Sequence, residues 1–279
     1  PSVKLYPNYT ELIDYYLPLE TEAYLAHLIE NNFSVTYLID SDFSILNQRL
    51  AQHYGIDDVI GQHLRKVSFG VETPRGGLLT MGSILKVTAD GIDTSPILRG
   101  AWISKNIVGT PLSPPPENVK AIEPDLSKAT TQKEQIKAHK ENESCYSCHK
   151  SIDPYGFALE NFDASGQWRD RYRVETAHKG TFIYRPQGHF KLVGEVDASG
   201  EIDGARFKDV RELKKILLSD HKMVAYVFAK KFFEYANGYK PNLKQRLALY
   251  EMIPDEAREC GLRDLLIDIL VYSCDGNPA

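Results

Sequence analysis

The sequence has no long hydrophobic run, and no segment approaches the length of a membrane-spanning helix. It also lacks an excess of positive charge, because 33 Lys and Arg face 38 Asp and Glu, which gives a net charge of −5 and a pI near 5.9. These absences argue against a membrane span in this chain and against a surface for nucleic acid or anionic lipid. At 279 residues, with 42% apolar and 25% charged residues, the composition is that of an ordinary globular protein.

Cysteine is rare, with four in the chain, and two of them form the run Cys145-Tyr146-Ser147-Cys148-His149. C-x-x-C-H is the attachment signature of a covalently bound c-type haem. On a helix, positions i, i+3 and i+4 share a face, so two thiols can reach the vinyl groups of one porphyrin while the imidazole binds the iron. We therefore predict that Cys145 and Cys148 bind the cofactor and that His149 is the axial ligand. The motif occurs once, so we expect one haem.

The alternative uses of a C-x-x-C pair have less support in this sequence. A structural zinc site needs four ligands, and the chain has neither a second C-x-x-C nor a closely spaced histidine pair. A redox C-x-x-C normally follows a strand of a βαβ unit, and nothing upstream of Cys145 has that pattern. Zinc, redox chemistry and a plain disulfide remain as weaker alternatives.

The other two cysteines, Cys260 and Cys274, flank a predicted helix over residues 262–273. About 14 residues at ~1.5 Å rise separate them by about 21 Å. A disulfide needs Cα atoms within roughly 7 Å, so these two cysteines should not pair. We expect ordinary thiols.

Hydrophobic periodicity predicts a mainly α fold, in which Asp42 caps the second helix and Gly109 stops the fourth. Polar residues 130–143 predict a solvated helix that leads into the haem motif. Glycines and aromatic residues between 177 and 204 predict a short β-hairpin or a structured loop. The helices are predicted over residues 10–31, 43–54, 77–87, 96–108, 208–218, 221–236, 241–252 and 262–273.

The run Pro111-Leu112-Ser113-Pro114-Pro115-Pro116 cannot be helical and predicts a stiff, extended connector. It divides the chain into a helical N-terminal domain over 1–112, a Pro-rich connector over 113–128, and a helical c-type haem domain over 129–279. The β-hairpin is an insertion in the last of these.

Four longer strings go beyond spacing: RGGLLTMGSILKVTADGIDTSPILRGAWI (75–103), GTPLSPPP (109–116), CYSCHKSIDPYGFALENFDASGQWR (145–169) and VDASGEIDGARFKDVRELKKILL (196–218). Together they resemble the planctomycete-type multidomain c-type cytochrome proteins, found also in marine proteobacteria. In those proteins three consecutive domains of unassigned function lie at the C-terminus. The resemblance implies an exported haem protein, often encoded with polysaccharide-related modules. Residues 172–194 depart from the pattern and form either a partner-binding insertion or an ordinary surface loop.

Residues that follow the motif are predicted to surround the haem. We expect the Nε2 atom of His149 to bind iron and its Nδ1–H to donate to a carbonyl near Pro154, in a turn formed by Asp153-Pro154-Tyr155-Gly156. The alternative is a turn that only reverses the chain. The apolar candidates for porphyrin contact are Phe157, Leu159, Phe162 and Trp168. Arg169 and Arg171 are either partners of the haem propionates or solvated surface residues.

The sixth iron ligand determines the chemistry of a haem, because methionine favours electron transfer and an open position favours peroxide or gas chemistry. Met81 is the first candidate, since Gly82 and Ser83 beside it are small enough for a flat macrocycle to approach. Core packing is the alternative role for this methionine. The other candidates are Met223 and Met252, followed by His27, His53, His63, His139, His178, His189 and His221.

Three functions are compatible with these observations. The first is a monohaem electron-transfer module that serves a redox partner protein, such as an exported polysaccharide-active oxidative enzyme. The second is a peroxidase or oxidase with a labile distal site, for which Glu72 and His63 are acid–base candidates. The third is a carbohydrate- or partner-binding module in which the haem is structural.

Export is expected from the cofactor, because c-type haem is attached after translocation. The chain opens at Pro1 without a signal peptide. We therefore expect a precursor with a signal sequence and a periplasmic or extracellular protein.

Overall fold

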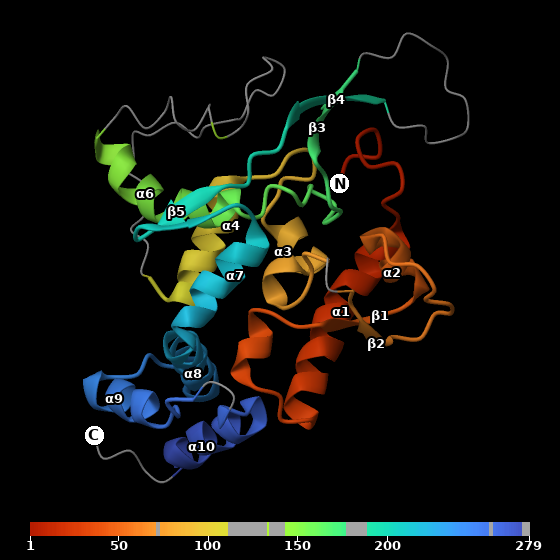
Figure 1. The fold of residues 1–279 in the computed structure, drawn as a ribbon. Helices are drawn as coiled ribbons and strands as arrows, with labels where there is room; N and C mark the ends of the chain where they lie inside the picture. Colours follow the sequence, from red (N-terminus) through yellow and green to blue (C-terminus); the bar gives the residue numbers. More distant parts are fainter. Residues whose placement is uncertain (71–72, 111–132, 134–142, 177–188, 257–258, 275–279) are drawn as a thin grey trace.

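The computed structural model describes residues 1–70, 73–110, 133, 143–176, 189–256 and 259–274, with the backbone alone at 143–148 (Figure 1). The helices and strands of these residues follow the order of the chain. The α-helices are α1 (Glu11–Glu30), α2 (Gln48–Tyr54), α3 (Gly82–Val87), α4 (Pro96–Ile103), α6 (Glu143–Phe157), α7 (Val210–Ser219), α8 (His221–Asn237), α9 (Leu243–Glu251) and α10 (Leu262–Cys274). Shorter helical segments are η1 (Val35–Leu38), η2 (Leu78–Thr80) and the π-helical η3 (Ser104–Val108).

The strands correct the predicted fold class. Three two-stranded antiparallel sheets lie among the described residues, so the protein is mixed α and β and not mainly α. Their register is fixed by pairs such as Phe43 with Ser68, Arg173 with Leu192 and Glu201 with Arg206. The strands are β1 (Phe43–Leu46) with β2 (Arg65–Ser68), β3 (Arg171–Glu175) with β4 (Phe190–Glu195), and β5 (Gly200–Ile202) with β6 (Ala205–Phe207).

The β1–β2 pair replaces the first half of a helix predicted over residues 43–54. All four residues of β1 are buried, including the polar Ser44, and a short segment that is buried throughout has the same pattern in a helix as in a strand. The helix starts later, where the Asn47 side chain accepts a hydrogen bond from the backbone N–H of Leu50. Asp42 is therefore not the N-cap, and this prediction is wrong.

Local signals place most other helices as expected. The Thr10 side chain caps α1, Asp209 caps α7, and Asp220 caps α8. Asn242 and Gln245 form a capping box at the start of α9. Gly109 ends η3 in the left-handed conformation, as predicted, with φ of 77°. The predicted helix over 130–143 and the Pro-rich connector lie outside the described residues, apart from Lys133 and Glu143.

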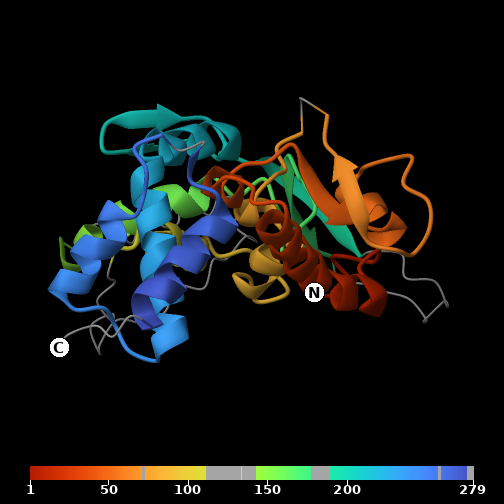
Figure 2. The ribbon, with the colours of Figure 1, turned by 90° about the horizontal axis from the view of Figure 1, so that it is seen from below.

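The N-terminal and C-terminal segments share one hydrophobic core. Figure 2 shows α1 beside the C-terminal helices, and Tyr24 and Leu28 of α1 belong to the same cluster as Phe233 of α8 and Ile269 of α10. This core joins residues that the predicted domain boundary assigns to different domains. Cys260 is buried and Cys274 is exposed, and both are free thiols.

Helices α4 and α6 cross at very short range through two glycines. A Cβ atom at Gly100 would overlap the backbone carbonyl of Ile152, and one at Gly156 would overlap that of Pro96. Glycine is therefore required at both positions for this close approach. The crossing fixes the C-terminal half of the helix that carries the C-x-x-C-H motif.

Candidate functional site

The motif Cys145-Tyr146-Ser147-Cys148-His149 lies on α6. Its backbone is helical, so positions 145, 148 and 149 share a face as the spacing predicts. The side chains of Cys145 and Cys148 lie outside the described part of the chain. Because α6 continues to Phe157, residues 153–156 form helix and not the predicted turn, with Pro154 inside it.

His149 and Asp153 form a pair one helical turn apart. The Nδ1 atom of His149 lies 2.9 Å from Oδ1 of Asp153, and this carboxylate accepts the hydrogen bond from the Nδ1–H group. The Asp153 side chain is fully buried, whereas that of His149 is 15% exposed. The acceptor is therefore a side-chain carboxylate and not the backbone carbonyl that the sequence predicted. A proton held on Nδ1 leaves the Nε2 lone pair for a metal, which is the usual arrangement of a ligating histidine.

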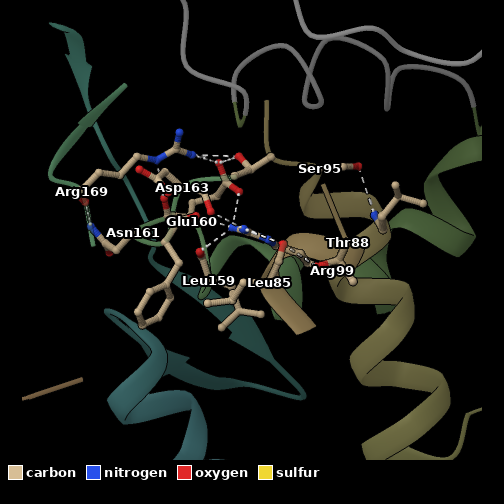
Figure 3. A network of polar contacts seen from close by, with 12 residues as sticks. Leu85, Thr88, Ser95, Arg99, Leu159, Glu160, Asn161, Asp163 and Arg169 are labelled. Carbon is tan, nitrogen blue, oxygen red and sulfur yellow. Dashed lines mark hydrogen bonds and ion pairs between the residues drawn. The ribbon is translucent and has the colours of Figure 1, made fainter. Parts of the chain in front are cut away.

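Buried cations hold the residues that follow α6. Arg99 of α4 is fully buried, and its Nη1 atom donates to the carbonyl oxygens of Leu159 at 2.8 Å and Phe162 at 2.6 Å (Figure 3). Its Nη2 atom donates to the carbonyl oxygens of Asp163 and Leu85. Burial lowers the pKa of Arg99 to about 10, so the guanidinium remains charged at neutral pH. One side chain thus fixes three carbonyls of the segment 158–169, called below the post-motif loop.

Arg169 closes the post-motif loop from its other end. Its Nη2 atom lies 3.1 Å from Oε2 of Glu160 and donates to the hydroxyl of Thr94 (Figure 3). Although burial alone would lower the pKa of Arg169, the nearby Glu160 carboxylate raises it. Arg169 is 5% exposed, so the alternative of a solvated arginine is wrong. Its predicted role toward a haem propionate stays a prediction, while Arg171, the other candidate, lies exposed on β3.

Turns inside the post-motif loop are fixed by Asp163. Its Oδ1 atom accepts from the backbone N–H and hydroxyl of Ser165 and from the backbone N–H of Gln167. Oδ2 forms an ion pair with Arg173 at 3.4 Å. The backbone carbonyl of Gly166 accepts from Arg75 at 2.6 Å. The loop is therefore held by charged groups from several segments of the chain, and its shape does not depend on its own sequence alone.

Three of the four apolar residues predicted to contact the porphyrin are buried in the protein core, and Trp168 is partly buried against it. Leu159 and Phe162 belong to a cluster with Ile103, Ile107 and residues of α7, and Phe157 is also buried. Trp168 packs edge-on against Phe162 and donates its indole N–H to Asp170. Contact of Phe157 and Trp168 with a haem stays a prediction.

Met81 packs in a hydrophobic cluster to which α6 contributes no described residue. It is 3% exposed, and the cluster contains residues of α1, α8 and α10. The space that Gly82 leaves is occupied by Leu17 and Tyr54, so the small residue serves protein packing and not the approach of a macrocycle. Distal ligation by Met81 stays a prediction, and core packing accounts for the methionine as observed.

Other distal candidates are distributed over the fold. Met223 is 39% exposed at the start of α8, whereas Met252 packs against the core that contains Met81. His27 packs against Phe33 and Phe43, and the Nε2 atom of His221 hydrogen-bonds the Asp255 carbonyl. His139, His178 and Glu72 lie outside the described residues. Within the described part of the chain, no three His, Cys, Asp or Glu side chains are grouped as metal ligands.

His53 has a structural role that the sequence did not predict. Its Nε2–H donates to the Ser165 carbonyl of the post-motif loop at 2.7 Å. Burial lowers the pKa of His53 to about 4, an effect that this hydrogen bond opposes and nearby Arg75 reinforces. His53 is therefore neutral at pH 7.

The low pKa of His53 predicts a loss of stability in acid. Because the unfolded state binds the proton more tightly, the free energy of unfolding falls as the pH drops from about 6.5 to about 4, by up to about 3 kcal/mol. Urea denaturation of wild type and His53→Gln should therefore show a stability difference that shifts by this amount across the window. Subtracting the two curves cancels the opposite effect of Asp93, whose pKa burial raises to about 6. A difference independent of pH would contradict the assignment.

The buried charged residues around the post-motif loop could not be predicted from the sequence. Arg99, Glu160, Asp163 and Asp153 were not predicted as site residues, since an isolated charged residue normally indicates a solvated surface. The i, i+4 spacing of His149 and Asp153 was the one local signal for their pairing.

Comparison with family models gives two matches. Residues 75–172 match the family described as PSCyt3, protein of unknown function (DUF1588). Residues 1–56 match the family described as PSD4, protein of unknown function (DUF1592). No curated protein and no solved structure matches the chain. These are domain families found in planctomycete-type cytochrome c proteins, and the first match contains the C-x-x-C-H motif and the entire post-motif loop.

Among the described residues, no helix combines the length and apolar character needed to cross a bilayer.

Proposed function

We propose that this chain is a monohaem c-type cytochrome module that transfers single electrons. The observation that carries the proposal is the hydrogen bond between His149 and buried Asp153, within a C-x-x-C-H helix. A redox pair has no need for a histidine whose Nδ1 proton is fixed and whose Nε2 is left as a base. A zinc site would use the same histidine arrangement, but it needs four ligands, and the sequence has neither a second C-x-x-C nor a closely spaced histidine pair. Membership of the planctomycete-type cytochromes is part of the same proposal and is supported by the two family matches.

The residues present fit a covalently attached haem. Cys145 and Cys148 would form the thioether bonds, and Nε2 of His149 would be the proximal ligand. Haem supplies a one-electron redox couple when bound. The protein contributes the orientation of the imidazole through Asp153 and a rigid support through the α4–α6 crossing and the post-motif loop. A rigid support of this kind suits electron transfer, in which the iron changes its charge while the surrounding protein keeps its structure.

Export and a redox partner complete the proposal. A c-type haem is attached outside the cytoplasm, so the protein would act in the periplasm or beyond the cell. The partner would be a redox protein, such as an oxidative enzyme that acts on polysaccharides. Absorption spectra of the ferric and ferrous protein with added CO test this function. A six-coordinate iron that does not bind CO is expected, and prompt CO binding would instead favour a peroxidase or oxidase.

Replacing the buried carboxylate should change the electronic properties of the iron. Asp153→Asn keeps the size of the side chain but removes the negative charge that makes the imidazole a stronger donor. We expect the reduction potential to rise, because a weaker donor stabilises the ferric state less. Redox titration followed by optical absorption measures the shift.

The control for this change is Asp57→Asn, which removes the same charge at an exposed position. Its potential should equal that of the wild type. If Asp153→Asn leaves the potential at the wild-type value, or lowers it, the pair does not orient an iron ligand.

A further inference from the structure

A cavity of about 310 Å³ lies between α8 and the end of α4. Its walls come from four parts of the chain: η1, η2, the α4–η3 segment and α8. The lining is almost wholly aliphatic and aromatic, and includes Leu38, Leu78, Trp102, Ile107, Phe228 and Phe232. A partly open apolar cavity of this size is typical of sites for small organic ligands.

The polar groups of the cavity are few and have one sign of charge. Lys231 and Asn106 line it, and Nζ of Lys231 donates to Oδ1 of Asn106 at 3.1 Å. Burial lowers the pKa of Lys231, and the positive charges of Lys105 and Lys230 lower it further, although Glu234 opposes them. An anion near Lys231 would relieve this repulsion, whereas a cation would increase it.

From this combination we propose that the cavity binds an apolar molecule with a single carboxylate, whose body contacts Trp102 and Phe228 and whose carboxylate accepts from Lys231. An apolar body is required because a polar one would lose its hydrogen bonds against these walls. One anionic group is required because Lys231 is the one charged residue among the described residues that line the cavity. The amide N–H₂ of Asn106 donates to the Trp102 carbonyl, so Asn106 holds Lys231 in place through its oxygen.

The site is separate from the haem helix and goes beyond the proposed function. On α4 and η3, Gly100 and Ser104 face α6, whereas Trp102 and Asn106 are two residues further along, on the opposite side. The thickness of α4 therefore stands between the cavity and α6. Ligand binding here does not require the haem.

Isothermal titration calorimetry of the haem-loaded protein with decanoate, below its micellar concentration, tests the proposal. Decanoate has an apolar chain and one carboxylate. We expect it to bind to wild type with one site, and to bind about tenfold more weakly to Lys231→Gln. Decanol, which has the same chain without the charge, should bind weakly and equally to both proteins.

Two further variants keep the result interpretable. Lys244→Gln removes a positive charge from an exposed position of α9 and should leave decanoate binding unchanged. Val224→Phe fills part of the cavity and should weaken both ligands, with circular dichroism confirming that it folds. The proposal is overturned if decanoate fails to bind wild type, or if Lys231→Gln and wild type bind it equally. Equal binding of decanoate and decanol to wild type would also overturn it.

Discussion

Arg99→Met lowers the free energy of unfolding by about 3–5 kcal/mol, the cost of removing one partner from a buried charged pair. Methionine fills much of the same volume but leaves the Glu160 carboxylate without this cation at 3.5 Å. It also removes the Arg99 donor from the carbonyls of Leu159, Phe162 and Asp163, of which Leu159 and Asp163 keep a backbone N–H donor. Each buried acceptor left unsatisfied adds to the cost. Urea denaturation followed by circular dichroism measures the change.

Two matched variants distinguish the loss of the Arg99 hydrogen bonds from the loss of a positive charge alone. Arg99→Lys retains the positive charge but cannot reach all five acceptors of Arg99 with one ammonium group, so its loss of stability should be intermediate. Arg206→Met removes an arginine whose side chain is 86% exposed and paired with Glu201, and should change stability by less than about 0.5 kcal/mol. If Arg99→Met proves as mild as Arg206→Met, the post-motif loop is not held by Arg99.

The double variant Cys145→Ser, Cys148→Ser abolishes covalent haem in the exported protein. Serine cannot form the thioether bonds, and a haem held by His149 alone would be lost under denaturing conditions. Denaturing electrophoresis with haem staining is the measurement. The wild type should stain and the double variant should not.

The chain provides its own control for this experiment. Cys274→Ser removes an exposed free thiol from α10 and should leave haem staining at the wild-type level. Staining that persists in the double variant would show that the motif does not attach the cofactor.

Helices with clear start signals and long periodic faces could be predicted from the sequence. Helix α1 begins at the residue after Thr10, and α8 and α10 begin within a residue of the expected positions. Each has a cap or an apolar face that points to one conformation only. The prediction for residues 43–46 was wrong for the opposite reason. Residues 43–46 are buried on both sides, so their pattern carries no period, and only pairing with a strand about twenty residues later identifies them.

The same contrast holds for the predicted site, where local patterns could be predicted and contacts between distant residues could not. The helical C-x-x-C-H motif is a local pattern, and its helix was found where the spacing placed it. The hydrogen bond partner of His149 was predicted as a carbonyl near Pro154, because that prediction assumed a turn where α6 in fact continues. Arg99 lies about sixty residues from its acceptors in sequence, and no local pattern reports a contact of that separation.

Gly82 beside Met81 illustrates what local composition does not report. A glycine beside a methionine was interpreted as room for a flat ligand. In the folded protein this room is filled by Leu17 and by Tyr54, whose hydroxyl also accepts from the Gly82 backbone N–H. Small residues thus report close packing, while the identity of the neighbour comes only from the tertiary structure.

Intact-mass spectrometry of the exported, mature protein tests the central claim most directly. If the chain is a monohaem c-type cytochrome, its mass exceeds that of the polypeptide by one haem, and the addition maps to the peptide that contains Cys145 and Cys148. A mature, folded protein with the mass of the bare polypeptide would contradict the account.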